Sequence, residues 1–217
     1  MILNRKRCFL AVLSLFVATA SWSQIRVDVM VSPQFNEDFS VRAGSDLNIP
    51  VTSRWTFVPG VYWSLRNRSA CHSKSSEGHR TDISSTDRAH FITVPVRMGY
   101  DISCRDKDKF DMRLLFGPYV AYGISGKSKK ETNVDGELSY EETGAFDADG
   151  RYRGRWDYGV NVGLNATFAR HYNVGVFCET GFRKIYNTDN VMENVVDELF
   201  GVAKINIAFG LSLGYRF

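Results

Sequence analysis

The sequence predicts an all-β fold, an eight-stranded antiparallel barrel in which consecutive strands follow one another around the ring as an up-and-down meander. Apolar and polar residues alternate with a period of two in eight segments, as in strands that have one apolar face. The connections between these segments alternate between short and long. After the first two dozen residues, no apolar run reaches the ~18 residues of a membrane-spanning helix.

A signal peptide is predicted over residues 1–23. A basic stretch at 5–7 precedes an almost entirely apolar run at 8–19, and small residues then lead to a cleavage site before Gln24. An uncleaved single-span anchor is disfavoured, because the apolar run is shorter than the ~20 residues that a spanning helix needs. We expect export, and a single barrel domain over residues 24–217.

The charge balance argues against a nucleic-acid partner. The chain has 27 Lys and Arg against 24 Asp and Glu, and the excess of three equals the basic residues of the predicted signal peptide. A nucleic-acid-binding domain would carry a basic surplus on one face. Three cysteines, Cys71, Cys104 and Cys178, lie after the predicted signal peptide. Their odd number and wide spacing indicate neither a disulfide framework nor a metal site. No cofactor is predicted.

The strands are placed by the alternation, in chain order. It is least regular in the third strand, where Val58 and Tyr62 lie on the otherwise polar face. It is clearest in the last strand, where the odd-numbered residues from Ile205 to Phe217 are apolar. The predicted strands cover residues 25–33, 39–50, 55–69, 88–102, 110–124, 155–169, 172–186 and 203–217.

The lengths of the connections indicate which end of the barrel faces the cell exterior. Short turns are predicted at 51–54, 103–109 and 170–171. Long polar loops are predicted at 70–87, 125–154 and 187–202, and the short first connection, 34–38, is an exception. Outer-membrane barrels have short periplasmic turns and longer extracellular loops. We therefore expect both termini in the periplasm and three long loops outside.

The composition of the polar faces indicates that they point into the barrel. These faces are rich in glycine, which suits a cramped interior and would weaken strands on a soluble surface. They also carry charges of both signs, which allows ion pairs inside. The glycines are Gly44, Gly60, Gly99, Gly117, Gly123, Gly159, Gly163, Gly175, Gly181, Gly210 and Gly214. The charged residues are Arg42, Asp46, Arg97, Asp101, Asp111, Arg113, Asp157, Glu179, Arg183 and Arg216.

The apolar faces are accordingly predicted to contact lipid. Aromatic residues gather near strand ends on these faces, where they suit girdles at the two lipid–water interfaces. They are Trp55, Phe57, Phe110, Trp156, Tyr158, Phe168, Tyr172, Tyr215 and Phe217. A closed barrel also satisfies every backbone donor and acceptor without water. The alternative is a soluble, lipocalin-like barrel, in which the apolar faces point inward and the polar faces point to water. Pro59, Pro95 and Pro118 lie inside predicted strands, and we expect bulges there.

Four stretches of sequence resemble a known family. They are 92–100 (ITVPVRMGY), 116–122 (FGPYVAY), 157–163 (DYGVNVG) and 213–217 (LGYRF). They are similar to strands of the small outer-membrane β-barrels of Bacteroidetes, called PorT-like, whose architecture is that of OmpA and OmpX barrels. The resemblance implies a small β-barrel fold and a location in the outer membrane. It also implies an accessory role in protein secretion, because one member of the family has that role. It also implies recognition of the terminal aromatic residue by the barrel-assembly machinery, and it supplies no catalytic residues.

One arrangement of residues is compatible with a hydrolase at the extracellular rim. His90 follows Asp82, Ser84, Ser85 and Asp87 in the sequence. A nucleophile needs a base within hydrogen-bond reach and a third group that orients the base. Closeness in sequence does not provide that geometry, so solvated loop residues are the favoured interpretation, and no catalytic residue is assigned.

Two motifs in the long connection 125–154 suggest ions or phosphates. Asp147, Asp149 and Gly150 resemble the middle of a calcium loop but lack its later bidentate glutamate. A basic cluster has the chemistry to contact lipopolysaccharide phosphates, although glutamates lie among its members and favour a self-neutralised surface. The basic residues are Lys127, Lys129, Lys130, Arg151, Arg153 and Arg155, and the acidic ones are Glu131, Glu137, Glu141 and Glu142.

These observations predict a non-enzymatic integral outer-membrane protein with a filled polar interior, because eight strands leave a lumen that side chains fill. Its expected partners are outer-membrane lipid and lipopolysaccharide, the barrel-assembly machinery and a protein that binds the loops. An accessory secretion barrel, a rim hydrolase and a soluble lipocalin-like binder remain the alternatives.

Overall fold

The computed structural model describes residues 25–36, 38–76, 79–102, 110–134, 137–147, 152, 154–182 and 206–217. The predicted signal peptide, the turn 103–109 with Cys104, and the predicted loop 187–202 lie outside these residues. Within the described residues, no helix is long and apolar enough to span a membrane.

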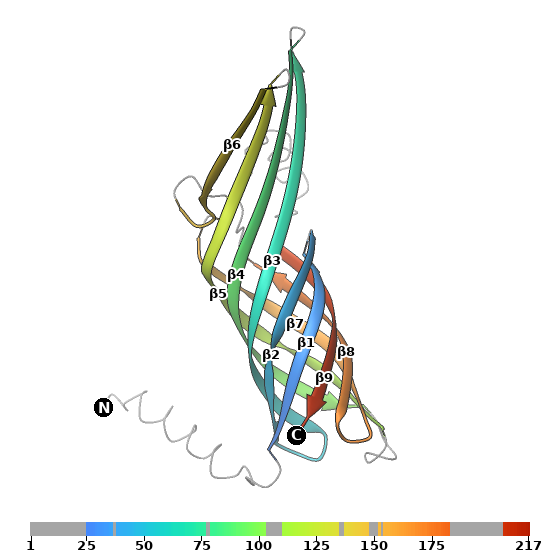
Figure 1. Ribbon diagram of the computed structural model, residues 1–217. Helices are drawn as coiled ribbons and strands as arrows, with labels where there is room; N and C mark the ends of the chain where they lie inside the picture. The colour runs from blue at the N-terminus through green and yellow to red at the C-terminus, as the bar shows by residue number, and fades with distance from the viewer. Residues whose placement is uncertain are drawn as a thin grey trace, which may run out of the picture.

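In these ranges, nine strands form a single antiparallel sheet (Figure 1). Their bounds are β1 Arg26–Asn36, β2 Asp38–Pro50, β3 Trp55–Ser76, β4 His79–Asp101, β5 Phe110–Val134, β6 Glu137–Gly144, β7 Trp156–Phe168, β8 Tyr172–Gly181 and β9 Asn206–Arg216.

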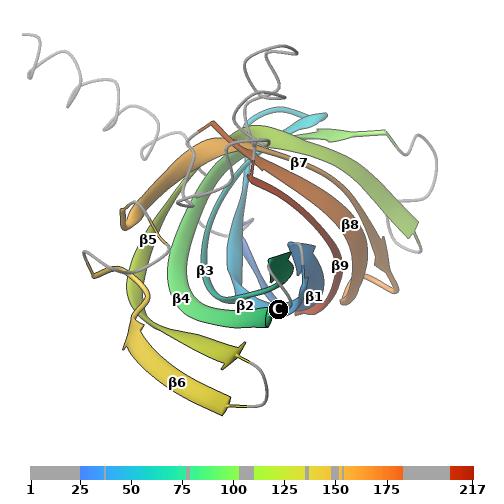
Figure 2. The ribbon, with the colours of Figure 1, turned by 90° about the horizontal axis from the view of Figure 1, so that it is seen from above.

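Eight of these strands close into a ring, as Figure 2 shows from above. The order is β4-β3-β2-β1-β9-β8-β7-β5, and pairing between β4 and β5 completes the circle. The first and last strands are neighbours, with Val31 opposite Leu213. The predicted eight-stranded antiparallel barrel is confirmed. The ninth strand, β6, pairs only with β5 among the described strands and lies outside the ring.

Two segments that we expected to be long loops are largely strands instead. The predicted loop 70–87 is a hairpin in which β3 and β4 pair as far as Ser76 and His79. The predicted loop 125–154 holds the end of β5 and all of β6. These segments have no apolar face because most of their residues are polar or charged, so the alternation that reveals a strand is lost although backbone pairing continues.

The expectation of bulges at the three prolines is wrong. The register is unchanged across Pro59, Pro95 and Pro118, and the one register shift among the described pairings of β4 with β5 falls between His90 and Phe91. The pairing simply omits bridges beside Pro95, where Val96 and Arg97 have no partner in β5. Proline lacks one backbone donor, so leaving out a few bridges accommodates it without an extra residue.

The facing of the side chains follows the prediction. In β7, Trp156, Tyr158, Val160 and Val162 are exposed on the outside, while the residues between them are buried inside the barrel. Aromatic pairs mark the two ends of this outer surface. Those at the short-turn end are Trp55–Tyr100, Phe110–Phe168 and Tyr172–Tyr215, and those at the other end are Phe35–Phe39, Trp63–His90 and Tyr122–Trp156.

Candidate functional site

The lumen is crossed by buried ion pairs between strands that are distant in sequence. The Arg66 guanidinium lies 2.8 Å from the Asp157 carboxylate, and both side chains are almost fully buried. The predicted pairing of interior charges is therefore confirmed, although Arg66 was not among the residues the sequence indicated. The other buried pairs inside the barrel are Arg42–Glu179 and Arg97–Asp46, and Arg216–Asp28 lies at the short-turn end.

Aromatic rings fill the space between these pairs. The Arg42 guanidinium stacks 3.7 Å from the centre of the Tyr62 ring and 4.9 Å from that of Phe177. Gly44 makes room for the first ring, because a Cβ there would lie 2.6 Å from Tyr62 Cδ1. The cavity beside these residues has a volume of about 20 Å³, enough for roughly one water molecule. The middle of the barrel is thus plugged.

A second aromatic cluster closes the end of the barrel opposite the short turns. Tyr152 and Phe146, which follow β6, pack on Phe91 of β4 with ring centres 5.8 and 5.7 Å apart. Ala145 and Tyr119 complete this cap and are buried with it. The cap lies directly above the Arg66–Asp157 pair, since Tyr119 donates a hydrogen bond to Asp157 at 3.2 Å.

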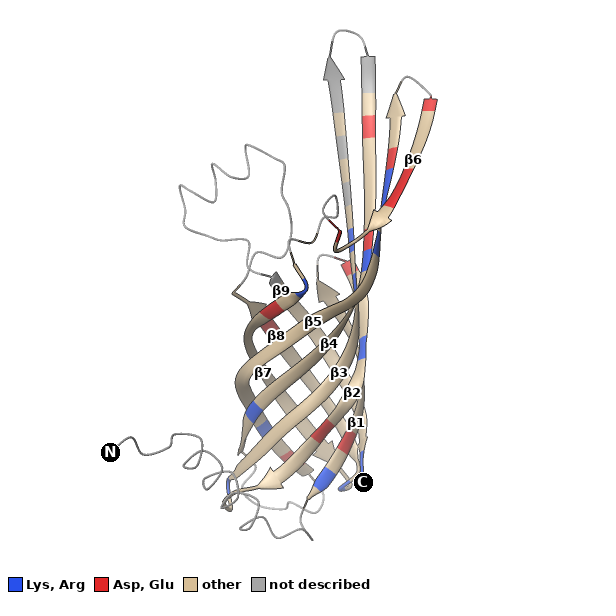
Figure 3. Cartoon of the chain, turned by 90° about the vertical axis from the view of Figure 1, so that its left-hand side faces the viewer, with Lys and Arg blue, Asp and Glu red and all other residues tan. Residues whose placement is uncertain are grey.

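Beyond the cap, parts of β3, β4, β5 and β6 continue as a four-stranded sheet that leaves the barrel (Figures 1 and 3). We call it the distal sheet, made of residues 67–76, 79–90, 125–134 and 137–144. The other strands of the ring stop lower, so β6 forms one outer edge. Leu138 and Tyr140 of β6 are 53% and 73% exposed, and Figure 3 shows acidic residues along the same strand.

The residues of the possible hydrolase do not meet. All five lie on the single extended strand β4, where successive side chains point to opposite faces. Ser85 and Asp87 are buried on the inner face, and Ser128 donates a hydrogen bond to Asp87. On the outer face, His90 stacks on Trp63 with ring centres 5.6 Å apart. Ser84 is six residues from His90, about 20 Å along a strand, so His90 cannot serve as its base.

The other histidines and the cysteines provide no alternative site among the described residues. His171 Nδ1 donates a hydrogen bond to the carbonyl oxygen of Arg216, and the imidazole stacks on Tyr215. Cys71 and Cys178 carry free thiols. Within the described part of the chain, no group of three His, Cys, Asp or Glu side chains is placed to hold a metal ion. Asp149 and Gly150 of the possible calcium loop lie outside that part.

The basic cluster is partly neutralised within the distal sheet, as the glutamates suggested. Lys127 Nζ lies 2.7 Å from Glu142 Oε1, and Lys129 Nζ lies 3.5 Å from Glu142 Oε2. This hydrogen bond from Lys127 lowers the pKa of Glu142 and raises the pKa of Lys127. Arg155 instead donates to the carbonyl oxygens of Gly123 and Ile124. Arg151 and Arg153 lie outside the described residues.

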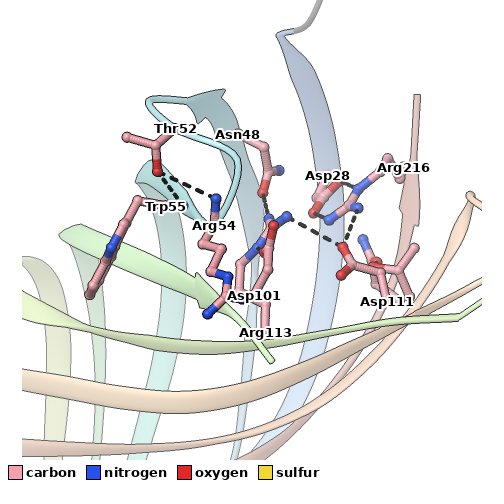
Figure 4. A network of polar contacts seen from close by, with 11 residues as sticks. Asp28, Asn48, Thr52, Arg54, Trp55, Asp101, Asp111, Arg113 and Arg216 are labelled. Atoms are coloured by element: carbon pink, nitrogen blue, oxygen red, sulfur yellow. Dashed lines mark hydrogen bonds and ion pairs between the residues drawn. The ribbon is translucent and has the colours of Figure 1, made fainter. Parts of the chain in front are cut away.

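The short-turn end of the barrel opens into a polar cup. Its volume is about 410 Å³. Figure 4 shows side chains that line the cup, among them Asn48, Arg113 and Arg216. Arg113 is held there by Asp101 at 2.6 Å, by Asn48 at 2.7 Å and by Asp111 at 3.4 Å. Arg216 makes two hydrogen bonds, of 2.7 and 2.8 Å, to the carboxylate of Asp28.

The closed ring, the lipid-facing apolar surface, the two girdles and the filled lumen define an integral membrane β-barrel of the outer-membrane class. Residues 16–187 match the family model described as outer membrane protein beta-barrel domain, and the chain therefore belongs to that family. The protein is located in the outer membrane.

Solved structures of other small outer-membrane barrels are similar to this chain. A major outer membrane protein of Thermus thermophilus is 13% identical with a TM-score of 0.43, covering 89% of this chain and 99% of that one. CarO of Acinetobacter baumannii is 11% identical with a TM-score of 0.40, covering 88% and 97%. Ail of Yersinia pestis is 13% identical with a TM-score of 0.34, covering 89% and 96%. No curated protein matches the chain.

Several residues of the plug and the cap were not recognised in the sequence as a group. Tyr62 and Val58 break the alternation of β3, and both are buried in the lumen. That irregularity was the available signal. Arg66 and Tyr152 gave none, because their partners Asp157 and Phe91 are far away in the sequence and meet them only through barrel closure.

Proposed function

We propose that the protein is a non-enzymatic, non-conducting outer-membrane anchor that holds the distal sheet outside the cell as an interaction surface. The length of its strands carries this proposal. A strand of ~9–11 residues crosses a membrane, whereas β3, β4 and β5 contain 22, 23 and 25 residues. At ~3.3 Å per residue, the excess extends tens of ångströms beyond the outer girdle.

The distal sheet has no structural role in closing the barrel. The ring is complete below it, where β5 pairs with β4 and β7. Building a polar hairpin and an additional strand has an entropic cost that the barrel itself does not require. Exposed Leu138 and Tyr140 on an acidic edge strand provide side chains of the kind that contact a partner.

Three further parts of the proposal concern processing of the chain, its lipid contacts and its insertion into the membrane. Residues 1–23 are removed on export, so the mature protein begins at Gln24, which mass spectrometry of the purified protein tests. Lipid surrounds the apolar belt, and lipopolysaccharide phosphates contact exposed basic residues such as Arg88 above the outer girdle. The barrel-assembly machinery inserts the chain through its last strand.

Photocrosslinking in living cells tests the interaction surface. A photoreactive phenylalanine analogue at Tyr140 should capture a protein or glycan, visible as a discrete band of higher mass. The same analogue at lipid-facing Val162 is the matched control and should yield no such band. If Tyr140 produces only the uncrosslinked protein in cells that display the sheet, the interaction role is wrong.

An accessory role in secretion is the second candidate, supported by the four PorT-like stretches. It predicts that cells lacking the distal sheet lose export of surface proteins. Residues 69–86 and 127–144, each replaced by an Asn-Gly turn, remove the sheet while the ring of eight strands is retained. Normal secretion by cells with this variant in the outer membrane contradicts the accessory role and leaves the general interaction role intact.

A further inference from the structure

We propose that the cup at the periplasmic end of the barrel binds a small hydrophilic anion that carries carboxylate or phosphate groups. The cup has a size suited to a ligand, since binding pockets typically enclose ~300–1,000 Å³ and this one encloses about 410 Å³. The short turns place this end in the periplasm. The site is separate from the distal sheet, which lies at the opposite end of the molecule (Figure 1).

The charge of the lining favours an anion. Four arginines line the cup, Arg26, Arg113, Arg170 and Arg216, against two carboxylates, Asp101 and Asp111. Arg113 and Arg216 are paired with three carboxylates, Asp101, Asp111 and Asp28, so the net positive charge of the cup depends on Arg26 and Arg170. Arg26 and Arg170 are exposed at the mouth of the cup, where an entering ligand meets them first. Guanidinium groups bind carboxylates and phosphates through paired donors.

The uncharged lining residues add hydrogen-bond donors. The side-chain oxygen of Asn48 accepts a hydrogen bond from Arg113, while its buried Nδ2 has no hydrogen-bond partner in the part of the chain that the structure describes. Thr52 and Thr56 contribute hydroxyl groups to the same surface. A cup rich in hydrogen-bond donors is complementary to a ligand rich in acceptors. An ionised carboxylate or phosphate group offers acceptors and no donors.

The inner end of the cup, toward the middle of the barrel, is closed, which distinguishes a binding site from the entrance of a channel. Beyond this inner end, the lumen is filled by the plug, which consists of Tyr62, Phe177 and Arg42. A charged cleft with walls of low dielectric constant concentrates ions of opposite sign. An anion that enters the cup therefore accumulates there and does not pass through the barrel.

Titration calorimetry on the full-length protein folded in detergent tests the site, with citrate and pyrophosphate as separate probes at low salt. Saturable binding of either probe supports it. Citrate alone indicates a carboxylate ligand, pyrophosphate alone a phosphate ligand, and both a general oxyanion site. The double variant Arg26→Gln/Arg170→Gln should bind at least roughly tenfold more weakly, because a hydrogen bond to a charged group contributes about that factor.

The matched control, Lys127→Gln/Lys129→Gln, removes two positive charges at the opposite end that are already paired with Glu142, and should bind like the wild type. A heat-dependent shift in gel migration verifies that each variant has folded. The proposal is overturned if neither probe binds saturably, or if the mouth variant binds as tightly as the control. The variant without the distal sheet should retain the site, so this test is independent of the proposed interaction role.

Discussion

At the scale of single residues, the interior of this barrel depends on ion pairs that have no access to water. Arg66 and Asp157 are the clearest case, with side chains only 3% and 0% exposed. The Arg66 guanidinium also lies 4.4 Å from the centre of the Phe91 ring, and Tyr119 donates to Asp157. Removing one partner leaves the other charge buried and unpaired, which costs more free energy than the pair itself contributes.

Asp157→Ala should therefore lower the free energy of unfolding by about 3–5 kcal/mol, measured by urea titration of the detergent-folded protein. Glu137→Ala, on the exposed edge strand, is the control and should change it by less than about 0.5 kcal/mol. Replacing both partners with leucine should restore much of the loss, since a packed apolar pair needs no compensation. Equal stability of the Asp157 and Glu137 variants contradicts a stabilising role for this pair.

The pKa of Glu142 predicts a dependence of the distal sheet on pH. Its pKa is lowered because Lys127 donates a hydrogen bond to the carboxylate. A lowered pKa means that the stabilising contact is present above the ordinary pKa of a glutamate and is lost as the pH falls through the lowered value.

Hydrogen exchange of the β6 amides, corrected for the intrinsic effect of pH, should consequently show less protection in acid than at neutral pH. Glu142→Gln cannot ionise and should abolish that difference. An unchanged difference in this variant would assign the pH dependence to another group.

At the scale of elements, each strand of the ring has one face that contacts lipid and one that lines the lumen. Val162 in β7 and Leu211 in β9 lie on the outer face and are 46% and 56% exposed. Both are near the middle of their strands, far from the aromatic pairs at the two ends. Below the distal sheet, the outward residues are chiefly aliphatic between the girdles, which suits the hydrocarbon core of a membrane.

Leu211→Arg or Val162→Arg should destabilise the barrel by about 2–4 kcal/mol, because a charge then lies near the midplane of the bilayer. Folding titrations into lipid vesicles measure this difference. Val134→Arg, equally apolar and exposed but in the distal sheet, is the matched control and should fold like the wild type. Normal assembly of both membrane variants would reverse the assignment of faces in those strands.

At the scale of the whole molecule, closure and filling together decide what the barrel can do. Pairing of β1 with β9 removes the free edges of the ring, and the plug and the cap occupy its lumen. We therefore expect the protein to cross the membrane without opening a path through it.

Planar lipid bilayers containing the purified protein should show no steady ion current. Tyr62→Ala/Phe177→Ala removes both rings that flank Arg42 and should raise the conductance measurably. Tyr140→Ala, in the distal sheet, is the control and should leave it unchanged. A large steady current through the wild-type protein would contradict the plugged lumen.

The pattern of residues was enough to predict the barrel, the direction of its faces and its place in a membrane. Alternation, glycine placement and aromatic residues at strand ends are local patterns in the sequence. They arise wherever a strand has one polar side that faces the lumen and one apolar side that faces lipid. Even the irregular positions Val58 and Tyr62 were visible as exceptions, although the plug they belong to was not.

The extent of β3 to β6, the partners of the buried charges and the cup follow from the arrangement of the strands in space. The distal strands are mostly polar on both faces, so their order comes from backbone pairing with neighbours and leaves no sustained periodic pattern in the sequence. Arg66 with Asp157, and Asp28 with Arg216, are brought together by closure of the ring, across separations of 91 and 188 residues. Contacts of that range depend on the geometry of the whole barrel, which no local pattern contains.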